Sequence, residues 1–103
     1  MARDEFFGLQ DAGQEALGDL LTRFEHDEQR RSEIKLVGNG LFELRANAEG
    51  NQYRALFFYD GSTYSIVVVC FQKNSRKLPD HIRDLAQDRM KSWQARGRTA
   101  RKQ

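Results

Sequence analysis

The chain has a single cysteine and only two histidines among its 103 residues. Cys70 has no second thiol with which to form a disulfide within the chain, and no Cys/His spacing resembles a zinc site. No apolar run approaches the length that crosses a membrane, and the N-terminal residues are acidic where a signal peptide would be basic and then apolar. We therefore expect a cytoplasmic protein with one modest core.

Acidic residues are also missing from the end of the chain. Residues 1–36 carry five Lys/Arg against nine Asp/Glu, whereas residues 37–103 carry twelve against six. After Asp88 there is no acid, and six cations follow: Arg89, Lys91, Arg96, Arg98, Arg101 and Lys102. Such a one-sided positive field favours an anionic partner, for which RNA or DNA is the usual candidate. The alternative is a solvated tail that only keeps the protein soluble.

The apolar pattern predicts one helix and then three strands. Apolar residues recur at three- and four-residue steps from Phe6 to Phe24, which predicts an amphipathic helix over about residues 4–24. The charged residues 25–35 predict an extension of that helix or a linker. Strands are predicted at 41–46, 52–59 and 64–71, joined by turns at 48–51 and at Asp60-Gly61. The apolar run 66–71 predicts that the third strand is the central or most covered one.

A second helix is predicted from Pro79 and Asp80, because proline is tolerated in a first turn and an acid suits the positive end of the helix dipole. Gly97 is predicted to end it. The predicted fold class is α+β, with a small antiparallel sheet, an N-terminal helical segment and a C-terminal helix packed on the sheet. The sheet is a three-strand meander, with a fourth strand as an option. Residues 1–96 form one domain, and 97–103 form a basic tail.

Arginines on the predicted strands are the first candidates for chemistry. Arginine is always charged and can contact phosphate bidentately. Fixed cations on a small sheet therefore suit a partner rich in phosphate better than a small neutral substrate. We predict that Arg45 and Arg54 bind phosphate. For Arg45 the alternative is a cross-strand ion pair on an exposed face.

Lysines follow the third predicted strand. Lys73 is a further candidate, as a phosphate contact or, if basic neighbours lower its pKa, as a proton acceptor. Arg76 and Lys77 are predicted to grip the RNA backbone, with a solvated loop as the alternative. His81 and Arg89 complete the predicted RNA-binding set. Cys70 reads as a small buried hydrophobe, not a nucleophile.

Several of these residues occur in an ordered set that resembles the phage-derived branch of the RelE/HigB toxin superfamily. The set is Glu43-Leu44-Arg45, Tyr53-Arg54, Phe71, Lys73, Lys77 and Pro79. The resemblance implies a small antiparallel sheet with helices packed on one face. It also implies a type II toxin that cleaves mRNA on the ribosome without a metal or other cofactor. In such an enzyme Arg45, Arg54 and Lys73 are the implied catalytic residues, with the two arginines stabilising the negative charge that builds on the phosphorane. A cognate antitoxin, of helix-turn-helix type, is the implied protein partner.

The sequence departs from that pattern at two positions near the third strand. Val69 stands where family members often have a histidine, and Asn74 follows Lys73 where a second lysine is usual. The strand that normally precedes the helical part is also missing. These departures keep a second interpretation open, namely a catalytically weak or inactive module of the same fold that binds nucleic acid or a protein. A purely structural protein is the third interpretation.

Overall fold

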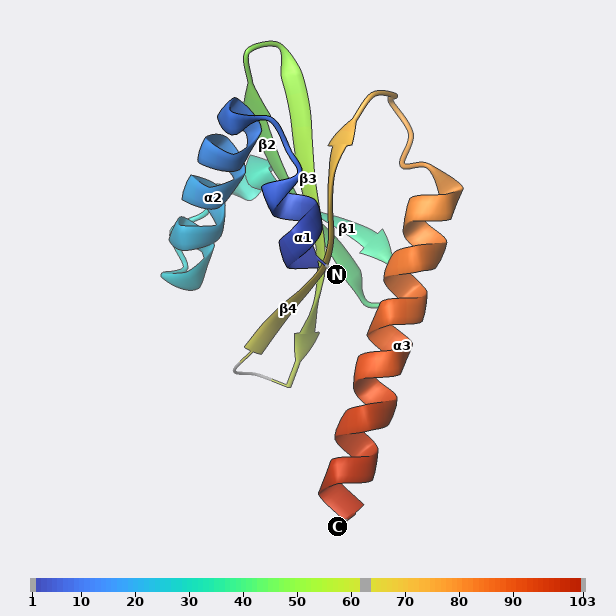
Figure 1. The fold of residues 1–103 in the computed structure, drawn as a ribbon. Helices are drawn as coiled ribbons and strands as arrows, with labels where there is room; N and C mark the ends of the chain where they lie inside the picture. Colours follow the sequence, from blue (N-terminus) through green and yellow to red (C-terminus); the bar gives the residue numbers. More distant parts are fainter. Residues whose placement is uncertain (1, 62–63, 103) are drawn as a thin grey trace.

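The computed structural model describes residues 2–61 and 64–102, with side chains described as far as residue 97. The elements are α1 (Ala2–Phe7), α2 (Asp11–Glu25), the 3-10 helix η1 (Arg31–Glu33), β1 (Ile34–Gly38), β2 (Leu41–Ala48), β3 (Asn51–Asp60), β4 (Tyr64–Lys73) and α3 (Asp80–Lys102). The strands form one antiparallel sheet in the order β1-β2-β3-β4 (Figure 1). The predicted α+β class is confirmed, and β1 is the optional fourth strand.

The N-terminal segment is two helices, so the prediction of a single helix is wrong. The Gly8 N–H still bonds to the carbonyls of Asp4 and Glu5, at 3.0 and 3.2 Å, but residues 8–10 then leave the helix. The Gln14 side chain donates to the carbonyls of Phe7 and Leu9 and so bridges the break. Because the chain turns here, α1 contacts β4 while α2 contacts β2 and β3.

Glycine is required at one position of α2. The ring of Tyr53, which is fully buried, lies so close to Gly13 that an added Cβ would overlap three of its ring carbons. The Tyr53 hydroxyl donates to Gln10 Oε1 at 3.0 Å, just before α2 begins. Because residue 13 is glycine, α2 can pack closely against Tyr53 of β3 at this point.

Each face of the sheet has its own apolar core. On one face α1 and α2 cover a cluster built from Ala2, Leu17, Leu20, Leu44, Ala46, Tyr53, Ala55, Phe57 and Cys70. On the other face α3 covers a second cluster of Leu41, Leu56, Phe58, Val68, Val69, Leu78, Ala86 and Met90. Figure 1 shows the blue helices and the orange helix on opposite sides of the strands. The expectation that all helices pack on one face is therefore wrong.

The strand β4 lies at an edge of the sheet and has fewer buried residues than β3, so the prediction that it is the central or most covered strand is wrong. Its apolar run has a different cause, since a bulge opposite Leu56 and Phe57 lets both Val68 and Val69 join the core under α3. Two charged side chains cover this edge. Glu5 accepts a bond from the Cys70 N–H at 3.3 Å, and Arg89 donates to the Val68 carbonyl at 2.7 Å. Pairing the free backbone groups of an edge strand protects it from association.

Both predicted turns are present. Glu49 and Gly50 join β2 to β3, and both have positive φ angles, of 52° and 79°. This conformation suits a tight hairpin and explains the glycine. Gly61 follows β3 with a φ of 71°, and the rest of that loop, 62–63, lies outside the described residues.

The helix α3 continues through Gly97 to Lys102, so the prediction that it ends at Gly97 is wrong. Its buried residues, Ala86 and Met90, lie in its first half, and Figure 1 shows the second half extending past the sheet. The side chains of the predicted basic tail beyond residue 97 lie outside the described part. None of the helices in that part is long and apolar enough to span a membrane.

Candidate functional site

Charged side chains gather on the sheet face that α3 covers only in part. In the strand register, Lys35 on β1 lies opposite Glu43 on β2, and Arg45 on β2 lies opposite Arg54 on β3. One step further, Lys73 at the end of β4 lies opposite Gln52. Directly opposed residues point to the same side of a sheet. The meander therefore brings cations from all four strands to one face.

A pocket of about 350 Å³ opens on this face. Its lining comes from β1, β2, the end of β4, the loop after β4 and α3: Lys35, Leu36, Val37, Glu43, Lys73, Arg76, Lys77, Leu78 and Arg83. Five of these nine residues are cations and one is an acid. Such an imbalance raises the local concentration of anions.

Glu43 lies beside the two predicted arginines. It is only 2% exposed, and its Oε1 is 3.7 Å from the Nε atoms of both Arg45 and Arg54. Like charges directly opposite each other across strands are destabilising, and the shared carboxylate offsets that repulsion. Both distances exceed those of a strong charge-assisted hydrogen bond, which are about 2.7–2.9 Å. Glu43 therefore neutralises one of the two guanidinium charges without being tightly bound to either.

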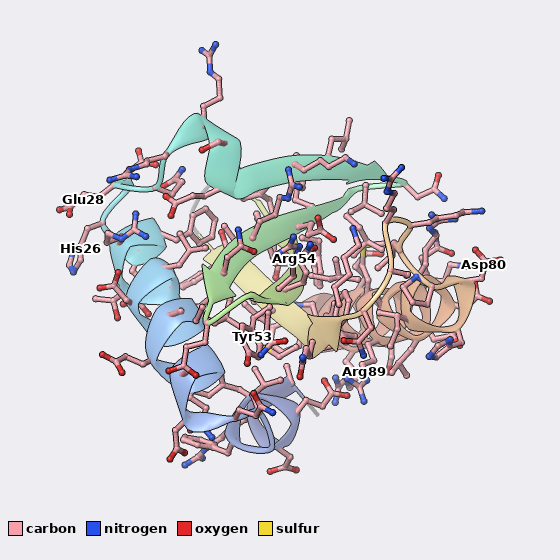
Figure 2. The ribbon with its side chains drawn as sticks, turned by 90° about the horizontal axis from the view of Figure 1, so that it is seen from above. His26, Glu28, Tyr53, Arg54, Asp80 and Arg89 are labelled. Carbon is pink, nitrogen blue, oxygen red and sulfur yellow. The ribbon has the colours of Figure 1, made fainter. Side chains whose placement is uncertain are left out.

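Arg54 is buried beneath this surface, at 2% exposure (Figure 2). Its Nη1 donates to the carbonyls of Ala46 and Tyr53, at 3.2 and 2.9 Å, and its Nη2 donates to Gln52 Oε1 at 2.9 Å. Burial lowers the pKa of the Arg54 guanidinium, and the Glu43 charge opposes that shift. The Nε atom has no hydrogen-bond partner among the described residues. A phosphate cannot reach Arg54 while Glu43 and the hydrogen bonds hold it here.

The other predicted catalytic residues are more accessible. The Arg45 side chain is 41% exposed beside Glu43, and Lys73 is half-buried at the end of β4. Arg76 and Lys77 are exposed in the following loop and line the same pocket as Lys73. The structure thus brings these three cations into one pocket, with Arg45 and Arg54 linked to it through Glu43.

Three charged residues of the pocket were not predicted as site residues. Glu43 belongs to the Glu-Leu-Arg sequence. Because it lies two residues before Arg45 on the same strand face, this spacing could have identified it as a site residue. Lys35 belongs to β1, which was not predicted as a strand because residues 25–35 are mostly charged. Arg83 belongs to the first turns of α3, where its Nη1 lies 3.7 Å from Asp80 Oδ1 and its buried Nε has no hydrogen-bond partner among the described residues.

Two of the predicted RNA-binding residues do not line the pocket. His81 is exposed in the first turn of α3. Arg89 lies further along this helix (Figure 2), where its Nη1 is 2.9 Å from both carboxylate oxygens of Glu5. These bonds cover the edge of β4, and we assign Arg89 a structural role.

The remaining reactive groups do not form a second catalytic site. Cys70 is buried, and burial together with the nearby Glu5 charge raises the pKa of its thiol to about 12. Within the described ranges, no group of three or more His, Cys, Asp or Glu residues could hold a metal ion. A second cavity, of about 670 Å³, is lined by aromatic residues, by Glu25 and Asp27 and by no Lys or Arg, so its charge does not suit a phosphate.

The fold and the pocket together define a small α+β protein with an anion-attracting site on one sheet face. The chain belongs to the family described as phage-derived Gp49-like proteins (DUF891), whose family model matches residues 4–91. The match covers every element except the last part of α3 and the first residues of α1. Membership is consistent with a toxin of a toxin–antitoxin system. No curated protein matches the chain.

Proposed function

We propose that the protein is the toxin of a type II toxin–antitoxin system and that it inhibits translation by cleaving mRNA on the ribosome. The observation that carries this proposal is the pocket whose lining contains five cations and one carboxylate. The phage-derived family supports a toxin, and the ordered residues from Glu43 to Pro79 support the RelE/HigB type. The proposed site of action is the cytoplasm.

In the proposed reaction the ribose 2′-hydroxyl attacks the adjacent phosphate. A bond forms between the 2′-oxygen and phosphorus, and the bond from phosphorus to the 5′-oxygen breaks. Glu43, the one carboxylate in the pocket lining, takes the proton from the 2′-hydroxyl. Arg45 and Lys73 stabilise the negative charge that develops on the phosphate oxygens. The Lys73 ammonium also carries the proton that the departing 5′-oxygen needs.

Arg54 acts on the substrate through Glu43. Since the Arg54 guanidinium is buried and held by four neighbouring carbonyl groups, it is a fixed positive charge 3.7 Å from the Glu43 carboxylate. It therefore orients the proton acceptor and does not contact the phosphate directly. Arg76, Lys77 and Arg83 bind the neighbouring phosphates of the mRNA.

The test is growth after induction of the protein alone, with recovery of cellular mRNA. We expect growth arrest and cut mRNAs from the wild type, and relief of both by Lys73→Ala or Arg45→Ala. Arg31→Ala removes an exposed cation outside the pocket and should leave the arrest unchanged. Normal growth under strong induction of a folded wild type contradicts the proposal.

A catalytically weak binding module is the second candidate. It is favoured by the burial of Glu43 and Arg54 and by Val69, which is 1% exposed in the core under α3. This module would bind RNA with strong salt dependence and leave it uncut. Cleavage of translated mRNA by purified protein with ribosomes would reject it.

An antitoxin is the proposed protein partner. Acidic side chains placed over the pocket would pair with Lys35, Lys73 and Arg83 and exclude RNA by competition. Such a complex should protect the pocket cations from chemical modification. Protection confined to other surfaces would contradict this mode of inhibition.

A further inference from the structure

The second half of α3 is highly charged, and its side chains bury little surface as far as the structure describes them. Residues 91–96 are all exposed, and Met90 is the last buried residue among the described side chains of the helix. At a rise of about 1.5 Å per residue, the twelve residues from Lys91 to Lys102 extend for about 18 Å. Figure 1 shows the C-terminal end of this helix extending past the sheet.

The direction of this helix is fixed where it leaves the core. The Trp93 indole N–H donates a hydrogen bond of 3.0 Å to Asp60 Oδ2, at the end of β3. The Arg96 guanidinium lies over the Trp93 ring at 5.8 Å from its centroid. The helix is therefore held against the sheet at Trp93, and Arg96 is placed beside it.

The composition of this segment indicates the chemistry of a partner. Residues 91–102 contain five cations and no acid, and Trp93 is their one large apolar residue. Protein partners generally bind through buried aromatic or aliphatic anchors, which are scarce here. Phosphate backbones need little more than cations. The charge without apolar anchors therefore favours a nucleic acid over a protein.

We propose that the segment Lys91–Lys102 of α3 is a second RNA-binding surface, separate from the pocket, that binds the phosphate backbone of duplex RNA. The choice of RNA over DNA rests on the proposed function, since a ribosome-dependent nuclease works among RNA duplexes. The helix then holds the protein on structured RNA while the pocket acts on a single strand.

The test is binding of the full chain to a fluorescent 16-base-pair RNA hairpin, measured by anisotropy between 50 and 300 mM salt. Lys91→Gln/Arg96→Gln removes two exposed cations. We expect a loss of about tenfold in affinity near 0.15 M salt. The negative slope of log K against log[salt] should become shallower by about 2. Arg30→Gln/Arg31→Gln makes the same change in net charge on another surface and should retain the wild-type slope.

Equal slopes for the two double variants overturn the proposal, as does binding to a poly-glutamate peptide in place of the hairpin. The growth assay separates this proposal from the nuclease proposal. If the wild type does not arrest growth but the helix variant loses its duplex binding, the nuclease proposal fails and the RNA-binding surface stands. If the wild type arrests growth and the helix variant binds the hairpin normally, the nuclease proposal stands and the RNA-binding surface on α3 is rejected. Matching thermal midpoints show that the variants are folded.

Discussion

The Glu43→Gln substitution should destabilise the protein because it removes the carboxylate that lies between two opposed arginines. Arg54 is 2% exposed and cannot turn to water when its partner is lost. Coulomb's law at 3.7 Å and an effective dielectric constant of 20 gives about 4–5 kcal/mol for this pair. Transferring the carboxylate out of water offsets part of that attraction. We expect a net loss of about 3 kcal/mol in the free energy of unfolding.

Urea unfolding followed by circular dichroism measures this loss. Glu15→Gln, which removes an exposed carboxylate on α2, is the matched control and should change stability by less than about 0.5 kcal/mol. In an Arg54→Met background, Glu43→Gln should be nearly neutral, because no buried charge is left without a partner. A loss below about 1 kcal/mol for Glu43→Gln alone would refute the idea that Glu43 neutralises Arg54.

Three further predictions concern residues outside the pocket. Gly13→Ala should destabilise the protein by about 2–3 kcal/mol because its Cβ overlaps the Tyr53 ring, whereas Gly97→Ala, with open space, should be neutral or stabilising; thermal unfolding compares them. Bonds from Arg23 lower the pKa of Glu33 from 4.5 to about 2. Since this folded-state pKa is depressed, the contribution is complete above about pH 4.5 and is lost as pH falls toward 2. About 1–2 kcal/mol should disappear on acidification, because the pair is partly exposed, and Glu33→Gln should flatten the profile. Cys70, whose pKa is raised to about 12, should react with a disulfide reagent only after unfolding.

The sequence predicted the strands from β2 to β4 because the turns between them have strong local signals. Asp60-Gly61 and the segment 48–51 predict two hairpins, and the apolar runs beside these turns then fit strands. The break in the N-terminal helix was not predictable from apolar spacing, since Leu9 and Leu17 keep the same helical spacing whether or not the chain turns at Gly8. The edge position of β4 was not evident from its apolar run, because the two side chains that cover this edge, Glu5 and Arg89, are 84 residues apart.

The pocket was predictable only in part. Lys73, Arg76 and Lys77 are close in sequence, and the structure brings them together. The burial of Arg54 was not predictable, because its hydrogen-bond partners include the backbone of the opposite strand. The ion pair of Arg89 was not predictable, because its partner Glu5 is an acid at the other end of the chain.

The pocket exists because one face of the sheet changes character at the same level on three strands. Positions facing α3 run from Leu41 to Glu43 and Arg45 on β2, and from Phe58 and Leu56 to Arg54 on β3. On β4 the apolar positions of this face stop at the same end of the sheet, and Lys73 comes next. The helix covers the apolar half, since burying it stabilises the fold, and it leaves the charged half open. A stable core and an anion site can therefore share one face, and substitutions at Arg45 or Lys73 should affect function much more than stability.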